Sequence, residues 1–306
     1  MDRYFLFWRN DQVNTRTDMA HEALQRCPEL SGVEEENESK GRMRISRIRV
    51  RTASAERKLD KPRGSYITLT LPEDGLSSKA VRREAGRCLA AELSILMGEV
   101  QSVLVVGLGN RHVTPDALGP QTIENLFVTR HVQNHLPELL PPGTRTVSAF
   151  AAGVMGVTGV ETAEAVTGIA SVLKPDLIVA VDALASSESD HVGTMVQLND
   201  TGISPGAGVG NFRMGLSRSN LGIPVIALGI PLVLTAEAIL YSGLLRMNAQ
   251  ELFMKAKKVL DSNFLSMCVT PKDIDAMVKD GASILSYGLN LALFGENYEA
   301  LEGLMR

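Results

Sequence analysis

The stretch SVLVVGLGNRHVTPDALGP, residues 102–120, combines a strand end, a tight turn and a helix start. Its apolar run, residues 103–106, predicts a buried strand, and Gly107 and Gly109 predict the turn that follows. In an open α/β sheet, functional sites form outside the carboxyl ends of such strands. We therefore expect the rest of the fold to be organised around this strand, with Asp116 close to its end.

A second stretch, PDLIVAVDAL at residues 175–184, is also an apolar strand that ends in an acid, Asp182. If both strands are parallel in one sheet, Asp116 and Asp182 emerge at the same edge. Each acid also has a structural alternative. Asp116 falls in the first turn of a helix capped by Thr114, where the helix dipole favours an acid. Asp182 could accept hydrogen bonds from a neighbouring loop, because a buried carboxylate is costly without partners.

Two carboxyl groups that lie close together cannot both ionise easily, so one of them is held protonated. The ionised group can take a proton from water, and the protonated group can donate to a carbonyl oxygen or a leaving amine. The pair Asp116 and Asp182 therefore predicts acid–base hydrolysis that needs no metal, cofactor or covalent nucleophile.

The bulk composition is that of a globular protein. The 306 residues are 44% hydrophobic. The net charge of −4 does not indicate the strongly basic surface of a nucleic-acid-binding protein. No apolar run approaches the roughly 20 residues that span a bilayer. We expect a cytoplasmic protein with no membrane or direct nucleic-acid partner. The three cysteines are too few and too scattered for a disulfide framework or a zinc site: Cys27, Cys88 and Cys268.

Strands alternate with helices along the chain, which predicts an α/β fold whose mostly parallel sheet is sandwiched by helices. Residues 42–71 predict a small antiparallel ribbon that is distinct from the main sheet. Residues 33–40 (VEEENESK) predict a solvated loop, and residues 18–24 a helix capped by Asp18. Further helices are expected at residues 78–97, 114–132 and 271–293. Another helix is expected to begin at a capping box formed by Thr158 and Glu161 and to end at residue 173. A strand is expected at residues 223–230, ending at Pro231.

Other catalytic or cofactor motifs fail on spacing. The third glycine of a dinucleotide-binding G-x-G-x-x-G motif would fall at His112, so the turn at Gly107 does not match it. The chain has no P-loop lysine, no H-E-x-x-H and no G-x-S-x-G motif.

A glycine-rich loop and two histidines are candidate substrate contacts. The loop could form a backbone nest for an anion or be a flexible loop beside the site. His112 and His191 lie near the two aspartates in sequence, although no second ligand stands at metal-binding spacing. We expect His191 and the loop to bind substrate, the loop through Gly206, Gly208, Gly210 and Asn211.

Taken together, these segments resemble the germination protease family of spore-forming bacteria. The family degrades the small acid-soluble proteins that coat spore DNA. The segments that carry the resemblance are VVGLGNRHVTPDALGPQTIENLFVTRH (105–131), GVMGVTGVET (153–162), KPDLIVAVDALA (174–185), DTGISPGAGVGN (200–211), LGIPVIALGIP (221–231) and VTPKDID (269–275).

The resemblance implies a zymogen that removes its own N-terminal segment. RTDMAHEA, residues 16–23, matches the processing region, which places the cut between Asp18 and Met19, with a propeptide at 1–18 and one peptidase domain at 19–306. The acids in the TPDALGP and DALA motifs, Asp116 and Asp182, correspond to the proposed catalytic pair. The resemblance further implies a homotetramer without a required metal, a location in the spore core, and a fold similar to that of hydrogenase-maturation proteases.

The chain departs from the family pattern at three places. Ala151 and Ala152 stand before GVMG where the family has proline, residues 186–192 (SSESDHV) replace an arginine-containing stretch, and Phe212 interrupts the basic residues after the glycine loop. These departures concern substrate preference and assembly. Two alternatives stay open: a metal-assisted peptidase that uses His112 or His191, and a non-catalytic protein that binds an anion or peptide at the glycine-rich loop.

Overall fold

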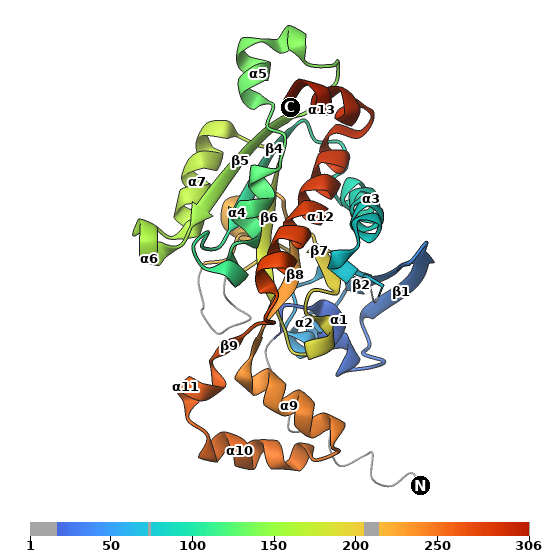
Figure 1. Cartoon of the computed structure of the whole chain (residues 1–306), viewed down its shortest axis with the longest axis vertical. Helices are drawn as coiled ribbons and strands as arrows, with labels where there is room; N and C mark the ends of the chain where they lie inside the picture. Colours follow the sequence, from blue (N-terminus) through green and yellow to red (C-terminus); the bar gives the residue numbers. More distant parts are fainter. Residues whose placement is uncertain (1–16, 73–74, 205–213, 306) are drawn as a thin grey trace.

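The computed structural model describes residues 17–72, 75–204 and 214–305, and within them the strands form one mixed sheet (Figure 1). The strands are β1 (Val33–Lys40), β2 (Met43–Val50), β3 (Gly64–Thr70), β4 (Ser102–Leu108), β5 (Thr146–Gly153), β6 (Leu177–Ser186), β7 (Met195–Asn199), β8 (Val225–Thr235) and β9 (Cys268–Val269). Their order is β1-β2-β3-β7-β8-β6-β4-β5, and β9 pairs with β8. Strands β5, β4, β6 and β8 are parallel, whereas β7, β3, β2 and β1 are each antiparallel to their neighbours. The predicted α/β class, with a parallel core and antiparallel strands near the N-terminus, is thus confirmed.

Helices cover both faces of the parallel strands (Figure 1). They are α1 (Ala20–Gln25), α2 (Ala53–Leu59), α3 (Lys79–Met97), α4 (Leu118–Glu124), α5 (Arg130–His135), α6 (Met155–Thr158), α7 (Thr162–Leu173), α8 (Arg218–Leu221), α9 (Ala236–Arg246), α10 (Phe253–Val259), α11 (Ser262–Leu265), α12 (Ile274–Phe294) and α13 (Tyr298–Met305). None of the helices in the described part of the chain is long and apolar enough to cross a membrane.

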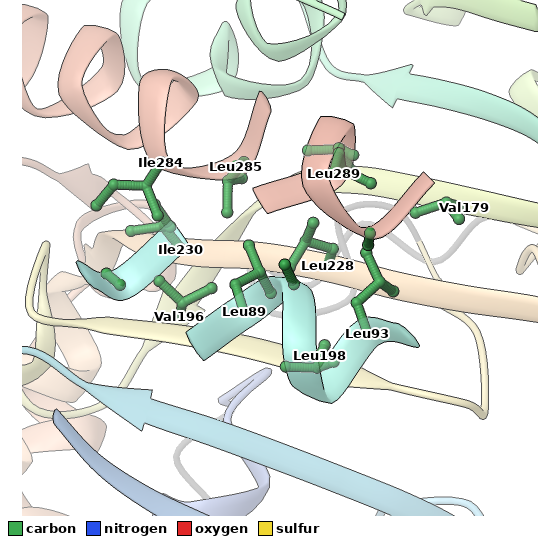
Figure 2. Close-up of a cluster of buried hydrophobic side chains, with 14 of the residues drawn as sticks. Leu89, Leu93, Val179, Val196, Leu198, Leu228, Ile230, Ile284, Leu285 and Leu289 are labelled. Atoms are coloured by element: carbon green, nitrogen blue, oxygen red, sulfur yellow. The ribbon is translucent and has the colours of Figure 1, made fainter. Parts of the chain in front are cut away.

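The larger apolar core lies on the face of the sheet that α3, α4 and α12 cover. Figure 2 shows leucines of α3 and α12 packed against β-branched and leucine side chains of β6, β7 and β8. Alternate residues of the same strands point to the opposite face, as the pleat requires, and there α7 covers a second cluster. Both faces of the central strands are therefore buried, so their sequences read as continuous apolar runs. Residues that represent the first cluster are Leu89, Leu93, Val179, Leu228, Ile284 and Leu289.

The antiparallel ribbon continues the main sheet, contrary to the expectation that it would be separate. Strand β3 pairs with β7 through Tyr66↔Asn199 to Thr70↔Met195. The expected loop at residues 33–40 is also wrong: this segment is β1, paired with β2 along its whole length. Its glutamates are exposed on an edge strand, where charge is tolerated because solvent covers both faces. Strand β2 therefore lies between β1 and β3, and its pairing with both is regular.

Two local expectations about helices are corrected. The helix expected at 114–132 is three pieces: a 3-10 turn (Thr114–Asp116), α4 and α5. The break between α4 and α5 is held by Asn290 of α12, whose amide accepts from the Phe127 N–H (2.9 Å) and donates to the carbonyl oxygen of Asn125 (3.0 Å). The capping box belongs to Glu161 and Glu164 rather than to Thr158 and Glu161, and it starts α7.

Strand β8 runs through Pro231 instead of stopping there. Pro231 pairs with Leu184, next to the point where the register between β6 and β8 shifts. Proline lacks an N–H, and the irregular register between Leu184 and Ala185 is the kind of place in a sheet where its absence is tolerated.

Candidate functional site

The two candidate aspartates follow neighbouring parallel strands. Strand β4 pairs with β6 up to Gly107↔Val181, and Asp182 is the next residue of β6. Beyond β4 the chain turns at Gly109, which has φ +102°, and enters the 3-10 turn that contains Asp116. The two acids therefore lie at the same edge of the sheet, as the parallel arrangement requires.

Asp116 is held by the turn that it closes. Its Oδ2 accepts a hydrogen bond from the Asn110 N–H at 2.6 Å. A Cβ at Gly109 would lie 2.0 Å from the Asp116 carbonyl oxygen and 2.9 Å from its Oδ1, so only glycine permits this turn. The N-cap of the 3-10 turn is Val113, and α4 begins only after Ala117, so the interpretation of Asp116 as a first-turn residue of an α-helix capped by Thr114 is wrong.

Asp182 is buried, with only 7% of its surface exposed, and its Oδ1 accepts from the Ala183 N–H at 2.9 Å. Two residues earlier, Ala180 belongs to the cluster under α7, so the alternation of the strand places the Asp182 side chain on that same face. Burial raises the pKa of Asp182 well above its usual range, and the nearby charges of Asp116 and Asp18 raise it further. Burial and these neighbouring charges therefore favour the protonated form of the Asp182 carboxyl.

The Asp18–Met19 bond lies beside this pair. The Asp18 N–H donates to the Ala185 carbonyl oxygen (2.9 Å), and the Ala185 N–H donates to Asp18 Oδ2 (2.8 Å), so this segment runs along the end of β6. The prediction that Asp18 caps α1 is wrong. Met19 occupies the N-cap position and makes no side-chain hydrogen bond there. Burial raises the pKa of Asp18, while the charge of Lys61 lowers it.

The residues on either side of Asp18 are also held. The Lys61 ammonium donates to the Thr17 carbonyl oxygen at 2.7 Å. The Met19 side chain is fully buried in a socket formed by Leu184, Met195 and Ile203. The expected cleavage point is thus an ordered part of the molecule, packed against the strand that carries Asp182.

Gln197 of β7 bridges this bond. Its Nε2 donates to the Asp18 carbonyl oxygen at 2.9 Å, and its Oε1 accepts from the Ala20 N–H at 2.7 Å. Gln197 is 3% exposed. Sequence reasoning missed this residue, because it lies inside an apolar strand more than 170 positions from the bond that it contacts.

His191 lies in a buried polar cluster around Glu22. Its Nδ1 is 2.7 Å from Glu22 Oε1. Ser186 and Ser187 donate to the same carboxylate, Ser187 through both its N–H (2.8 Å) and its hydroxyl (2.6 Å), and the Thr17 hydroxyl donates at 2.5 Å. Burial acts to raise the pKa of Glu22, but these hydrogen bonds outweigh it and lower the pKa to about 2.

This cluster ties α1 to the segment after β6. The expected role of His191 in substrate binding stays a prediction. Glu22, like Lys61, was missed because nothing in the local sequence marks it as buried.

The candidate glycine loop, with Gly206, Gly208, Gly210 and Asn211, lies outside the described residues. Its flanks are joined by Ile203 and Leu216, whose N–H groups donate to each other's carbonyl oxygens at 2.9 and 2.7 Å. Within the described ranges no three His, Cys, Asp or Glu side chains gather into a possible metal site.

Comparison with known proteins identifies the family. The family model described as "Germination protease" matches residues 11–245. The chain belongs to the germination protease family. It is therefore a hydrolase, an endopeptidase of the aspartic type.

Curated germination proteases are similar over nearly the whole chain. One from Caldanaerobacter subterraneus subsp. tengcongensis is 39% identical over 92% of this chain and 94% of its own length. One from Clostridium tetani is 36% identical over 92% of this chain and 96% of its own length. Among germination proteases of other genera, one from Halalkalibacterium halodurans is 36% identical over 92% of this chain and 94% of its own length.

Among solved structures, a nickel–iron hydrogenase maturation protease, HycI from Thermococcus kodakarensis, aligns with a TM-score of 0.31 and 19% identity. It covers 55% of this chain and 98% of its own.

Proposed function

We propose that this germination protease is a zymogen that cuts its own chain between Asp18 and Met19, and that the released enzyme degrades small acid-soluble spore proteins during germination. The observation that carries the proposal is the position of the Asp18–Met19 bond. The Asp18 backbone and carboxylate are hydrogen-bonded to Ala185, three residues beyond Asp182, and the Asp18 charge raises the pKa of Asp182.

In the proposed reaction, Asp116 and Asp182 share the acid–base work. The ionised carboxylate takes a proton from a water molecule as the water oxygen attacks the Asp18 carbonyl carbon. The protonated carboxyl donates its proton to the Met19 nitrogen as the C–N bond breaks. The raised pKa of Asp182 supports its role as the acid in this pair.

Processing of residues 1–18 would leave Met19 as the new terminus and empty the space that Thr17 and Asp18 occupy beside β6. A protein substrate could then place its own peptide bond there, which is how the propeptide would hold the enzyme inactive. We also propose that His191 and the loop with Gly206, Gly208, Gly210 and Asn211 contact the substrate. We also propose that the protein assembles as a homotetramer and resides in the spore core. These two points rest only on its membership of the family.

The test is the intact mass of the purified chain over time at mildly acidic pH, for the wild type, Asp182→Asn and Asp116→Asn. The wild type should lose its first 18 residues, and neither variant should. Asp273→Asn is the matched control, because this exposed aspartate makes no capping hydrogen bond at the start of α12. Processing by either site variant at the wild-type rate would refute the aspartate pair, and a wild type that stays whole would refute self-processing at this bond.

A further inference from the structure

Gln197 and Asp182 lie on the same face of the sheet, two strands apart. Asp182 of β6 pairs with Gly229 of β8, and Gly229 pairs with Gln197 of β7. Paired residues point to the same face, so the two polar side chains stand on either side of a residue that has none. Two strand spacings, about 10 Å in all, separate their backbones.

The missing side chain between them is a steric requirement. A Cβ at Gly229 would lie 2.4 Å from the Asp182 carbonyl oxygen and 2.7 Å from Leu184 Cγ. The Leu184 side chain therefore occupies the space over Gly229, and the chain at Asp18 is bound on one side by Ala185 of β6 and on the other by Gln197 of β7. The Asp18 segment thus lies between the strand that carries Asp182 and the strand that carries Gln197.

We infer that Gln197 is a catalytic residue that stabilises the oxyanion formed at the Asp18 carbonyl when the chain is cut. The inference rests on the proposed cleavage between Asp18 and Met19. Its support is direct contact: the Gln197 Nε2 already donates to the oxygen that would carry the negative charge, at 2.9 Å. A donor that is fixed before the reaction stabilises the transition state without reorganising.

The other end of the same amide fixes its orientation. A carbonyl oxygen requires a donor and a backbone N–H requires an acceptor, so the contacts to Asp18 and Ala20 permit only one orientation of the amide. Among the described residues, the hydrogen bond that the Asp18 carbonyl accepts comes from Gln197. The neighbouring carbonyl of Thr17 is held by a different group, the Lys61 ammonium.

The step balances with water as the only co-reactant. The water oxygen forms a bond to the Asp18 carbonyl carbon, and its proton goes to the ionised carboxylate of the Asp116/Asp182 pair. The electron pair of the C=O bond moves onto the oxygen, where the Gln197 N–H donates to it. The pair then returns, the C–N bond breaks, and the Met19 nitrogen leaves with a proton from the other carboxyl.

Two substitutions separate the donor from the structural contact. Gln197→Met removes both hydrogen bonds at nearly the same volume. Gln197→Glu keeps an acceptor for the Ala20 N–H but at neutral pH presents an oxygen without a proton to the Asp18 carbonyl. The control is Thr68→Val, on the residue of β3 paired with Gln197; the Thr68 hydroxyl is buried and has no hydrogen-bond partner among the described residues.

The measurement is the self-cleavage rate of the full chain from intact mass at several pH values, with thermal unfolding of each variant beside it. Gln197→Met should be slower by about 10²–10³-fold at every pH, the usual effect of removing one oxyanion donor. Gln197→Glu should be about as slow at neutral pH, and its rate relative to Gln197→Met should rise as the new carboxyl gains a proton and becomes a donor. Thr68→Val should cleave as the wild type does.

The outcomes distinguish the role of Gln197 from the proposed self-cleavage after Asp18. Cleavage of the wild type together with an unchanged rate in Gln197→Glu at neutral pH would overturn the role of Gln197 and leave the proposed function standing. A Gln197→Glu/Gln197→Met ratio that stays constant with pH would show that the residue only holds the chain, and would overturn the inference. A wild type that is not cut at Asp18 would overturn both.

Discussion

Asp18 and Ala185 exchange two hydrogen bonds: the Asp18 N–H donates to the Ala185 carbonyl oxygen at 2.9 Å, and the Ala185 N–H donates to Asp18 Oδ2 at 2.8 Å. The second of these bonds uses a side chain where a sheet would use a backbone carbonyl. The segment before α1 therefore binds the end of β6 as a substitute strand. This contact holds the proposed cleavage point in place before any chemistry.

The hydrogen bond from the Ala185 N–H to Asp18 should depend on a side-chain oxygen at position 18 and not on the negative charge of the carboxylate. We predict that Asp18→Asn keeps an acceptor for the Ala185 N–H and retains self-cleavage within about tenfold of the wild type. Asp18→Ala leaves that N–H unpaired, at a cost of about 1–3 kcal/mol. Urea unfolding and intact mass measure the two effects. Equal stability of the Asn and Ala variants would contradict this account.

The buried Asp182 should make the folded state less stable as pH rises. Its pKa is raised in the folded protein, so its contribution to stability is fully present below the unfolded pKa near 4 and is lost as pH rises through the folded pKa. A pKa difference of one between the two states corresponds to about 1.4 kcal/mol. Asp182→Asn lacks this titration, so the variant should gain stability over the wild type between pH 4 and 8.

The comparison is made by urea unfolding of both proteins across that range. The difference between the two proteins reports the titration of Asp182 together with its coupling to Asp116 and Asp18. A difference that is independent of pH would contradict burial as the cause.

The contribution of Glu22 to the stability of the folded state should increase with pH, opposite to that of Asp182. Its pKa is lowered from 4.5 to about 2 in the folded protein, so its stabilising contribution is present above pH 4.5 and is lost as pH falls through about 2. Glu22→Gln should therefore lower the free energy of unfolding by about 3 kcal/mol at pH 7 and by progressively less at lower pH.

Urea unfolding at pH 3 to 7 tests this prediction. Glu34→Gln is the matched control, because its ion pair with Arg51 is exposed to solvent and should matter far less. A Glu22→Gln protein as stable as the wild type at pH 7 would show that the hydrogen bonds from Ser186, Ser187 and Thr17 do not depend on the charge.

The position of Gly229, between Asp182 and Gln197, should not tolerate a side chain. Gly229→Ala places a methyl group 2.4 Å from the Asp182 carbonyl oxygen, which belongs to a central strand and cannot move alone. We expect a loss of about 1–3 kcal/mol, as for other overpacked sites, together with slower self-cleavage.

Gly168→Ala is the control for this substitution. A Cβ at Gly168 would meet nothing within 4 Å on the exposed side of α7. Because alanine favours helix more than glycine does, this variant should gain about 0.5–1 kcal/mol. If Gly229→Ala unfolds and cleaves like the wild type, the steric argument fails.

Regular elements with a strong apolar pattern were predictable. Strands β4 and β6 and helices α3 and α12 follow from runs and stripes of apolar residues, because burial on known faces dictates those patterns. The apolar pattern did not predict a strand whose structure depends on pairing with a neighbouring strand and not on burial. Strand β1 is charged along its length and exists because β2 pairs with it.

The sequence by itself determined the family, the parallel strand ends and the two aspartates that follow them, since short motifs and strand periodicity carry that information. Only the tertiary structure brought Gln197 to the Asp18 carbonyl and Glu22 to Ser186 and Ser187. These partners lie more than 150 positions apart along the chain. Their meeting depends on the sheet order, which places β7 beside β8 and folds the N-terminal segment against β6, and no local pattern encodes that order.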